Sequence, residues 1–149
     1  MGISEEIKQE KFKSEFSKAV VNILYTNSWI NQQNLQLFKS YGLTTPQFNI
    51  LRILRGQHPN PATVNLLIDR MLDKSSNASR IIDKLEQKGL VVRSQCSKDR
   101  RAVDVLISAR GLDLLAKMDD EMHAWERSSN NLTEKEAEML NFLLDKVRS

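Results

Sequence analysis

Three cations gather on a short segment between two apolar runs. Lys98, Arg100 and Arg101 surround Asp99, while residues 90–93 and 103–107 have the apolar content and alternation of strands. The pattern predicts a β-hairpin with the cations at its tip. Hairpin tips are ordinarily small and neutral, because Asn and Gly set the turn. A tip of this charge is suited to contact a polyanion.

Asp99 is the anion of this tip, and its position predicts a supporting role. It stands two residues before Arg101, so its carboxylate is expected to orient that guanidinium through charge-assisted hydrogen bonds. The alternative is an exposed ion pair, worth only ~0–1 kcal/mol.

A second polar group precedes the hairpin, at the start of a helix expected over about residues 75–88, with Gly89 as its left-handed C-terminal residue. The candidate contact residues of this group are Lys74, Ser75, Ser76, Asn77, Ser79 and Arg80. The major groove of DNA admits an α-helix, where Asn suits adenine, Arg suits guanine and Ser suits bases or phosphates. Taken alone, the serines are equally compatible with caps and surface residues. The hairpin favours DNA, because an Arg on a narrow tip can enter the minor groove.

Apolar residues at helical spacing predict the elements that position these groups. The expected helices cover about residues 5–25, 29–41, 44–56, 62–72, 75–88, 109–129 and 134–147. Thr44 with Gln47 and Thr133 with Glu136 have capping-box spacing, and Ser108 is a further N-cap candidate. The helices over 62–72 and 75–88, joined by a short turn, match a helix-turn-helix. The predicted fold class is mainly α with a small β-hairpin wing.

Composition restricts the function classes. A chain of 149 residues with 40% apolar and 28% charged residues is expected to form one soluble domain. The sequence contains no apolar run long enough to span a bilayer, and we expect no signal peptide because its first residues include acidic ones and no apolar core. Its single cysteine, Cys96, fits a reducing cytoplasm. It also shows no metal-ligand spacing, nucleophile–base pair or phosphate loop, and His58 and His123 are isolated. We therefore expect no enzyme, no metal and no cofactor.

The charge is unevenly distributed. Residues 70–101 hold nine Lys and Arg against four Asp and Glu, whereas residues 112–149 hold five against nine. A basic middle and an acidic end place a polyanionic partner at the middle.

Three motifs in order carry a family resemblance. Residues 99–111 (Asp99-x-Arg101-x-x-x-Val105-x-Ile107-Ser108-x-x-Gly111) resemble the wing signature of the MarR family of bacterial transcriptional regulators. Residues 43–51 resemble the opening of that family's third helix, and residues 79–91 resemble its recognition helix and exit.

The resemblance implies a winged helix-turn-helix homodimer. Residues 43–108 would form the DNA-binding lobe, and residues 1–28 and 109–149 the dimerisation helices. The dimer would bind a pseudo-palindromic operator, most often as a repressor, with recognition helices in successive major grooves. Arg101 would enter the minor groove, with Lys98 and Arg100 on phosphates.

The family's small-molecule pocket suggests residues near Tyr25, Trp29, Phe38 and Tyr41, and an aromatic or phenolic effector. Aromatic residues at this spacing are also typical of a core. Cys96, on the expected wing, is interpreted as a bystander rather than a redox sensor. The alternative function is a helical protein–protein module whose wing contacts an acidic partner without sequence preference.

Overall fold

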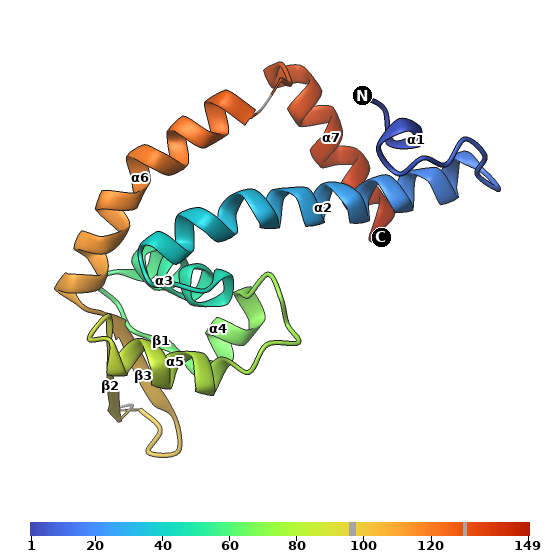
Figure 1. Ribbon diagram of the computed structural model, residues 1–149. Helices are drawn as coiled ribbons and strands as arrows, with labels where there is room; N and C mark the ends of the chain where they lie inside the picture. The colour runs from blue at the N-terminus through green and yellow to red at the C-terminus, as the bar shows by residue number, and fades with distance from the viewer. Residues whose placement is uncertain (96–97, 130) are drawn as a thin grey trace. The chain divides into compact units, whose positions relative to one another are not determined.

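The computed structural model describes residues 1–95, 98–129 and 131–149. The chain divides into two compact units, Met1–Leu112 and Asp113–Ser149. The helices are α1 (Ile3–Glu6), α2 (Glu15–Ser40), α3 (Thr45–Gln57), α4 (Val64–Arg70), α5 (Ala78–Gln87), α6 (Ala109–Ser129) and α7 (Glu134–Val147), and the strands are β1 (Ala62–Thr63), β2 (Val91–Gln95) and β3 (Val103–Ile107). The expected fold class, mainly α with a small β-hairpin, is confirmed (Figure 1).

The N-terminal region differs from the expected pair of helices over 5–25 and 29–41. α2 is a single helix of 26 residues that begins after Ser14, whose side chain accepts a hydrogen bond from the Ser17 N–H. The expected break at residues 26–28 was wrong. Thr, Asn and Ser lower helix stability by only a few tenths of a kcal/mol each, up to about 0.7, and neither Gly nor Pro interrupts the segment.

α2 ends in a Schellman motif at Gly42, whose φ of +72° lies in the left-handed region. The Leu43 N–H donates to the Phe38 carbonyl and the Gly42 N–H to the Lys39 carbonyl. Thr44 then caps α3, and Thr44 and Gln47 form the predicted capping box. Residues 41–44 therefore contain both the signal that ends α2 and the signal that begins α3.

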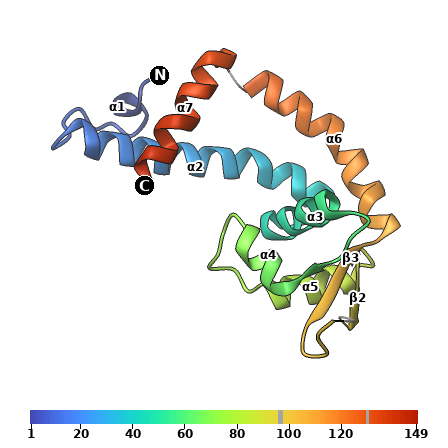
Figure 2. The same ribbon diagram turned by 180° about the vertical axis from the view of Figure 1, so that it is seen from behind.

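The core of the first unit lies between α3, α5 and the sheet. Its fully buried side chains include Ile50, Leu51 and Leu54 of α3 and Ile82 and Leu85 of α5. Phe38 at the end of α2 stacks on Phe48 of α3, with 4.4 Å between ring centroids. Figures 1 and 2, seen from opposite sides, show α3, α4 and α5 lying close together beside the sheet.

The helix-turn-helix is shorter than expected at both helix starts. Residues 62 and 63 form β1, which pairs with Val105 and Asp104 of β3, so the sheet has three antiparallel strands in the order β1-β3-β2. A strand of two residues has no periodicity to detect, and its partner lies some forty residues away. α5 begins at Ala78 rather than at residue 75, because Asn77 caps it.

β2 and β3 form the predicted hairpin, with Val91 opposite Ile107 and Gln95 opposite Val103. Val91, Val105 and Ile107 are buried, so the base of the hairpin is fixed to the core. Gly89 has the predicted left-handed φ of +72°. Ser108 accepts a hydrogen bond from the Gly111 N–H at 3.0 Å and donates one to the Gly89 carbonyl, as expected of a cap for α6.

The second unit contains most of α6 and all of α7. Thr133 and Glu136 form the predicted capping box of α7. α7 leaves several large apolar side chains exposed, namely Met139, Leu140, Phe142, Leu143 and Val147. No helix in the described part of the chain is both long and apolar enough to cross a membrane.

Candidate nucleic-acid interface

The start of α5 presents a capped, exposed turn. The Asn77 side-chain oxygen accepts a hydrogen bond from the Arg80 N–H at 3.2 Å. Ser79 and Arg80 are exposed on the first turn of the helix. Asn77 is therefore occupied as a cap through its oxygen, while its amide N–H₂ and the Arg80 guanidinium remain as donors toward a base edge or phosphate.

The turn before α5 is closed by Asp73. Its carboxylate accepts hydrogen bonds from the Ser75 N–H at 3.0 Å, the Ser75 hydroxyl at 2.5 Å and the Ser76 hydroxyl at 3.2 Å. The Ser75 hydroxyl, followed by the Ser75 N–H, lowers the pKa of Asp73. Because each hydroxyl has one proton, Ser75 and Ser76 as arranged here have none to donate to a phosphate.

The lysines before, within and after α5 differ in whether they are hydrogen-bonded to other parts of the protein. Lys74 donates to the Asp69 carbonyl at 2.8 Å, and Lys88 donates to the Gly42 carbonyl and to Gln47. Lys84 is exposed and lies with Asn77 and Arg80 around a niche of about 250 Å³. Sequence reasoning did not select Lys84, although its i+4 spacing from Arg80 places both cations on one helix face.

The hairpin tip is a hydrogen-bonded turn. The Ala102 N–H donates to the Asp99 carbonyl at 3.1 Å, and the Arg101 N–H donates to the Asp99 carboxylate at 2.9 Å. Gln95 also donates to the Arg100 carbonyl at 3.0 Å. Asp99 was expected to contact the Arg101 guanidinium, but it contacts the Arg101 backbone instead. An Asp at the first position of a turn commonly accepts the N–H two residues further on.

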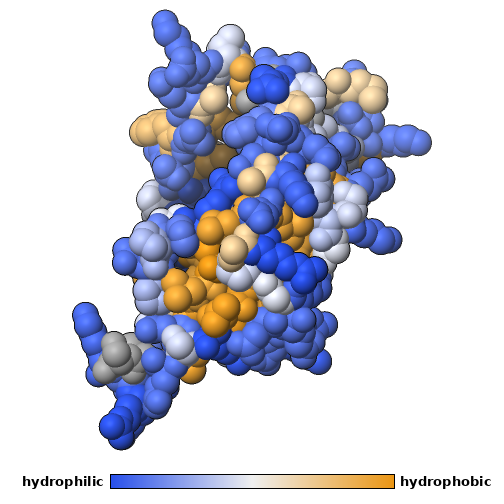
Figure 3. All heavy atoms as spheres, turned by 90° about the vertical axis from the view of Figure 1, so that its left-hand side faces the viewer, coloured by the Kyte–Doolittle hydropathy of each residue, from blue (hydrophilic) through white to orange (hydrophobic). Residues whose placement is uncertain are grey.

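The cations of the tip point to solvent. Lys98, Arg100 and Arg101 are all exposed. In Figure 3 the wing projects at the lower left as a hydrophilic arm. Two sets of exposed cations therefore stand on separate elements, one on α5 and one on the wing. Cys96 lies outside the described residues.

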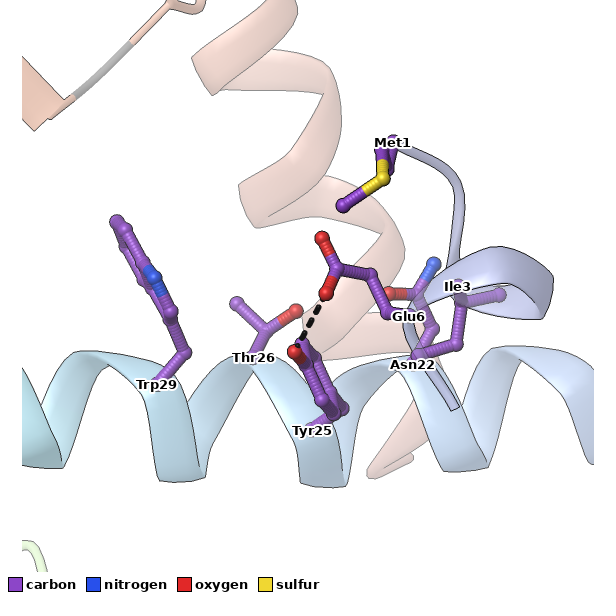
Figure 4. A pocket seen from close by; sticks show the side chains of 7 residues that line it. All are labelled: Met1, Ile3, Glu6, Asn22, Tyr25, Thr26 and Trp29. Carbon is purple, nitrogen blue, oxygen red and sulfur yellow. Dashed lines mark hydrogen bonds between the residues drawn. The ribbon is translucent and has the colours of Figure 1, made fainter. Parts of the chain in front are cut away.

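The four aromatic residues proposed for an effector pocket are not brought together. Tyr25 and Trp29 line a cavity of about 310 Å³ with Glu6, Asn22 and Thr26, as Figure 4 shows. Phe38 is buried in the core, and Tyr41 is the C-cap of α2. Thirteen helical residues separate Tyr25 from Phe38, or about 20 Å along the axis, so one small pocket cannot include both.

The Tyr25 hydroxyl donates to the Glu6 carboxylate at 2.9 Å, which ties α1 to α2. This hydrogen bond is the main cause of a raised pKa for Tyr25. The pocket therefore combines two aromatic rings with a carboxylate, and a negatively charged ligand is disfavoured there.

A larger cavity, of about 690 Å³, lies between α2, α3 and the α4–α5 turn. Its lining includes Asn27, Asn31, Leu35, Asn49, Met71, Leu72 and Asp73. Asn49 accepts a hydrogen bond from the Leu72 N–H at 3.0 Å. Sequence reasoning missed this cavity, because polar residues from three separate segments leave no local pattern.

The family model of MarR matches residues 43–103, from the end of α2 to the start of β3. The match covers the helix-turn-helix, β2 and the tip of the wing, which carry both sets of cations. Over these residues the chain is similar to the MarR family of transcriptional regulators. The similarity supports the prediction from the three sequence motifs, a DNA-binding transcriptional regulator, and the relatives are named as regulators rather than enzymes.

Similar proteins agree with this match. The HTH-type regulator YkoM of Bacillus subtilis is 29% identical over 79% of this chain and 76% of its own length. A MarR transcription factor from Planctomyces limnophilus has a crystal structure with a TM-score of 0.68 and 28% identity, over 91% of this chain and 98% of that one.

Two more distant structures share the MarR fold. Staphylococcus aureus MepR, solved in complex with DNA, has a TM-score of 0.77 at 19% identity and covers 92% of this chain and 97% of its own. The organohalide-sensing regulator RdhR, solved with 2,4-dichlorophenol bound, has a TM-score of 0.78 at 21% identity and covers 94% and 85%.

Proposed function

We propose that this protein acts as a homodimeric transcriptional repressor that binds a pseudo-palindromic operator through α5 and the wing. The observation that carries the proposal is the placement of exposed cations on two elements of one lobe, Arg80 and Lys84 on α5 and Arg101 with its neighbours on the wing. A helix in the major groove and an Arg in the adjacent minor groove would engage the DNA together. MepR, which has the same fold, was solved in complex with DNA, and this supports the binding of DNA by this fold.

The homodimer is proposed from apolar surface. α7 exposes Phe142 and Leu143, and the first half of α2 exposes Phe16, Val20 and Leu24. Side chains of this size gathered on helix faces typically mark an interface. A second copy of the chain is the proposed partner, and it would set the spacing of the two α5 helices at one helical turn of DNA.

The test begins with selection of bound DNA from a random pool, followed by affinity measurements across a range of salt concentrations. We expect a palindromic site and an affinity that falls steeply with salt, because neutralised phosphates release counterions. Arg101→Ala should weaken binding by about tenfold or more, on the order of 1–3 kcal/mol. The same loss of charge at Lys13, in the segment before α2, should leave affinity unchanged.

Two outcomes would reject the proposal. Recovery of no consensus from the pool would favour a protein–protein module with a basic wing. Wild-type affinity for Arg101→Ala would remove the wing from the interface. Sedimentation of both variants as dimers is the control that separates loss of DNA contact from loss of assembly.

We propose in addition that a small aromatic molecule releases the DNA by occupying the 690 Å³ cavity. The cavity borders Asp73, which closes the turn before α5, and RdhR, of the same fold, binds 2,4-dichlorophenol. A neutral phenol would also fit the smaller pocket of Tyr25 and Trp29, by donating to Glu6.

The two cavities can be distinguished. Trp29 and Trp125 are the two tryptophans of the sequence, so Trp125→Phe leaves Trp29 as the one fluorescent indole. The larger cavity is supported if dichlorophenol releases DNA without changing Trp29 emission, and if it no longer releases DNA from the Asn49→Leu variant. Quenching of Trp29 together with release in Asn49→Leu would assign the effector to the smaller pocket.

A further inference from the structure

Arg93 is a cation of the wing strand β2, but its contacts point inward, to α5. Its backbone N–H donates to the Glu86 carboxylate at 3.2 Å. Its guanidinium donates to the Ser79 carbonyl at 3.1 Å and forms an ion pair with Asp83. These three contacts fall on the first, middle and last turns of α5, so one residue spans the length of the helix.

The Arg93 side chain is poorly placed to meet a phosphate. It is 30% exposed, and its Nε atom is buried without a partner among the described residues. The cations proposed to contact DNA are by contrast exposed. Arg93 thus adds to the charge of the basic segment without adding a free guanidinium to the interface.

We propose that Arg93 is a positioning residue that fixes the angle between α5 and the wing, so that Arg80 and Arg101 reach adjacent grooves together. This inference rests on the proposed binding of DNA through both elements. Without the guanidinium, the hairpin and α5 stay joined at their base by Val91 and Leu85, both buried. The lobe therefore remains folded while the wing gains freedom to swing, and part of the binding free energy is then spent on ordering it.

The experiment is a double-mutant cycle on the selected operator, using the full-length protein at fixed salt. The four proteins are wild type, Arg93→Met, Arg101→Ala and the double variant. Met keeps most of the apolar stem and removes the hydrogen bonds and the charge. We expect Arg93→Met to weaken binding about tenfold, and Arg101→Ala to cost several-fold less in the Arg93→Met background than in wild type, because coupled sites are not additive.

Salt dependence separates positioning from direct contact. A lost phosphate contact reduces the slope of log affinity against log salt by about one. We expect the slope of Arg93→Met to match wild type and the slope of Lys84→Met to fall. Additive losses in the cycle together with a reduced slope for Arg93→Met would overturn the proposal, as would undiminished affinity.

Asp83→Asn provides an independent arm. It leaves Arg93 intact, makes α5 more positive and removes the ion pair, so we expect weaker binding despite the gain in charge. Asp69→Asn on α4 makes the same change of charge outside this network and should bind at least as tightly as wild type. Equal gains from both would show that only net charge matters. If wild type itself selects no operator, the proposed function fails rather than this inference.

Discussion

Gly111→Ala is the substitution whose effect the structure specifies most closely. Gly111 lies in the first turn of α6, and a methyl group there would stand 2.4 Å from the Leu90 carbonyl oxygen and 2.7 Å from Cγ1 of Ile107. The oxygen cannot turn aside, since it accepts the Ser108 N–H at 2.9 Å. The methyl group therefore forces apart the exit of α5, the end of β3 and the start of α6.

Two opposing effects set the magnitude. Inserting a methyl group into a packed site costs about 1–3 kcal/mol, and the fixed backbone oxygen argues for the upper end. Replacing Gly by Ala in a helix returns about 1 kcal/mol. The net expectation is a loss of about 2 kcal/mol in the free energy of unfolding, or roughly 4–8 °C in Tm for a chain of this size.

Gly56→Ala is the matched control. Gly56 lies near the end of α3, and a methyl group there meets no atom within 4 Å. The same chemical change should raise stability by about 0.5–1 kcal/mol, because only the helix propensity changes. Urea unfolding followed by circular dichroism, at equal protomer concentrations, gives both values. The packing argument would be refuted if Gly111→Ala were as stable as wild type, or if both variants changed the free energy of unfolding in the same direction.

The remaining predictions concern a turn and two caps. Asp99→Ala should weaken operator binding several-fold in a titration with labelled DNA, because the tip turn loses its hydrogen-bond acceptor, although the tip becomes more positive. Asp99→Asn keeps an acceptor and should bind at least as tightly as wild type. Equal gains in affinity from both variants would mean that the tip acts only through its net charge. Asn77→Ala should cost about 1 kcal/mol of stability and also weaken operator binding, whereas Asn77→Ser keeps the N-cap and should do neither. Full operator affinity for Asn77→Ala would show that the first turn of α5 forms without this cap. The Thr133 N–H, followed by its hydroxyl, lowers the pKa of Glu136 below its ordinary 4.5. The stability that this carboxylate adds is therefore complete above pH 4.5 and is lost as the pH falls through its lowered pKa. The urea midpoints of wild type and Glu136→Gln should therefore converge on acidification. A constant difference between the two midpoints from pH 6 to pH 3 would contradict this prediction.

Local sequence signals predicted the helix ends well. The capping boxes at Thr44 and Thr133 and the left-handed Gly89 are each decided by residues within one turn of one another, and all three are present. The family motifs succeeded because they combine several such local decisions at fixed spacing. The cations of the tip are exposed as expected for the same reason, since a short hairpin leaves them no interior to enter.

Two of the failures, at β1 and at Arg93, involve partners distant in sequence. β1 exists because β3 pairs with it, and α2 crosses residues 26–28 because nothing stronger than weak propensity opposes it. Arg93 counts as a free cation in any charge tally, yet its ion pair with Asp83 crosses from strand to helix. Phe38 was grouped with Tyr25 by residue type alone, although the helix rise separates them.

The continuity of α2 has a mechanical consequence. A helix of 26 residues is a stiff rod about 39 Å long, anchored at its C-terminal end by the stacking of Phe38 on Phe48. Two helices with a joint at residues 26–28 would absorb a small rotation of either part. In one rod, a tilt of about 5° at the Gly42 end moves the far end by about 3 Å, given the rise per residue of an α-helix. The exposed apolar side chains near that end would move with it, so in the proposed homodimer the spacing between the two lobes would depend on the tilt of α2 and not on a hinge within it.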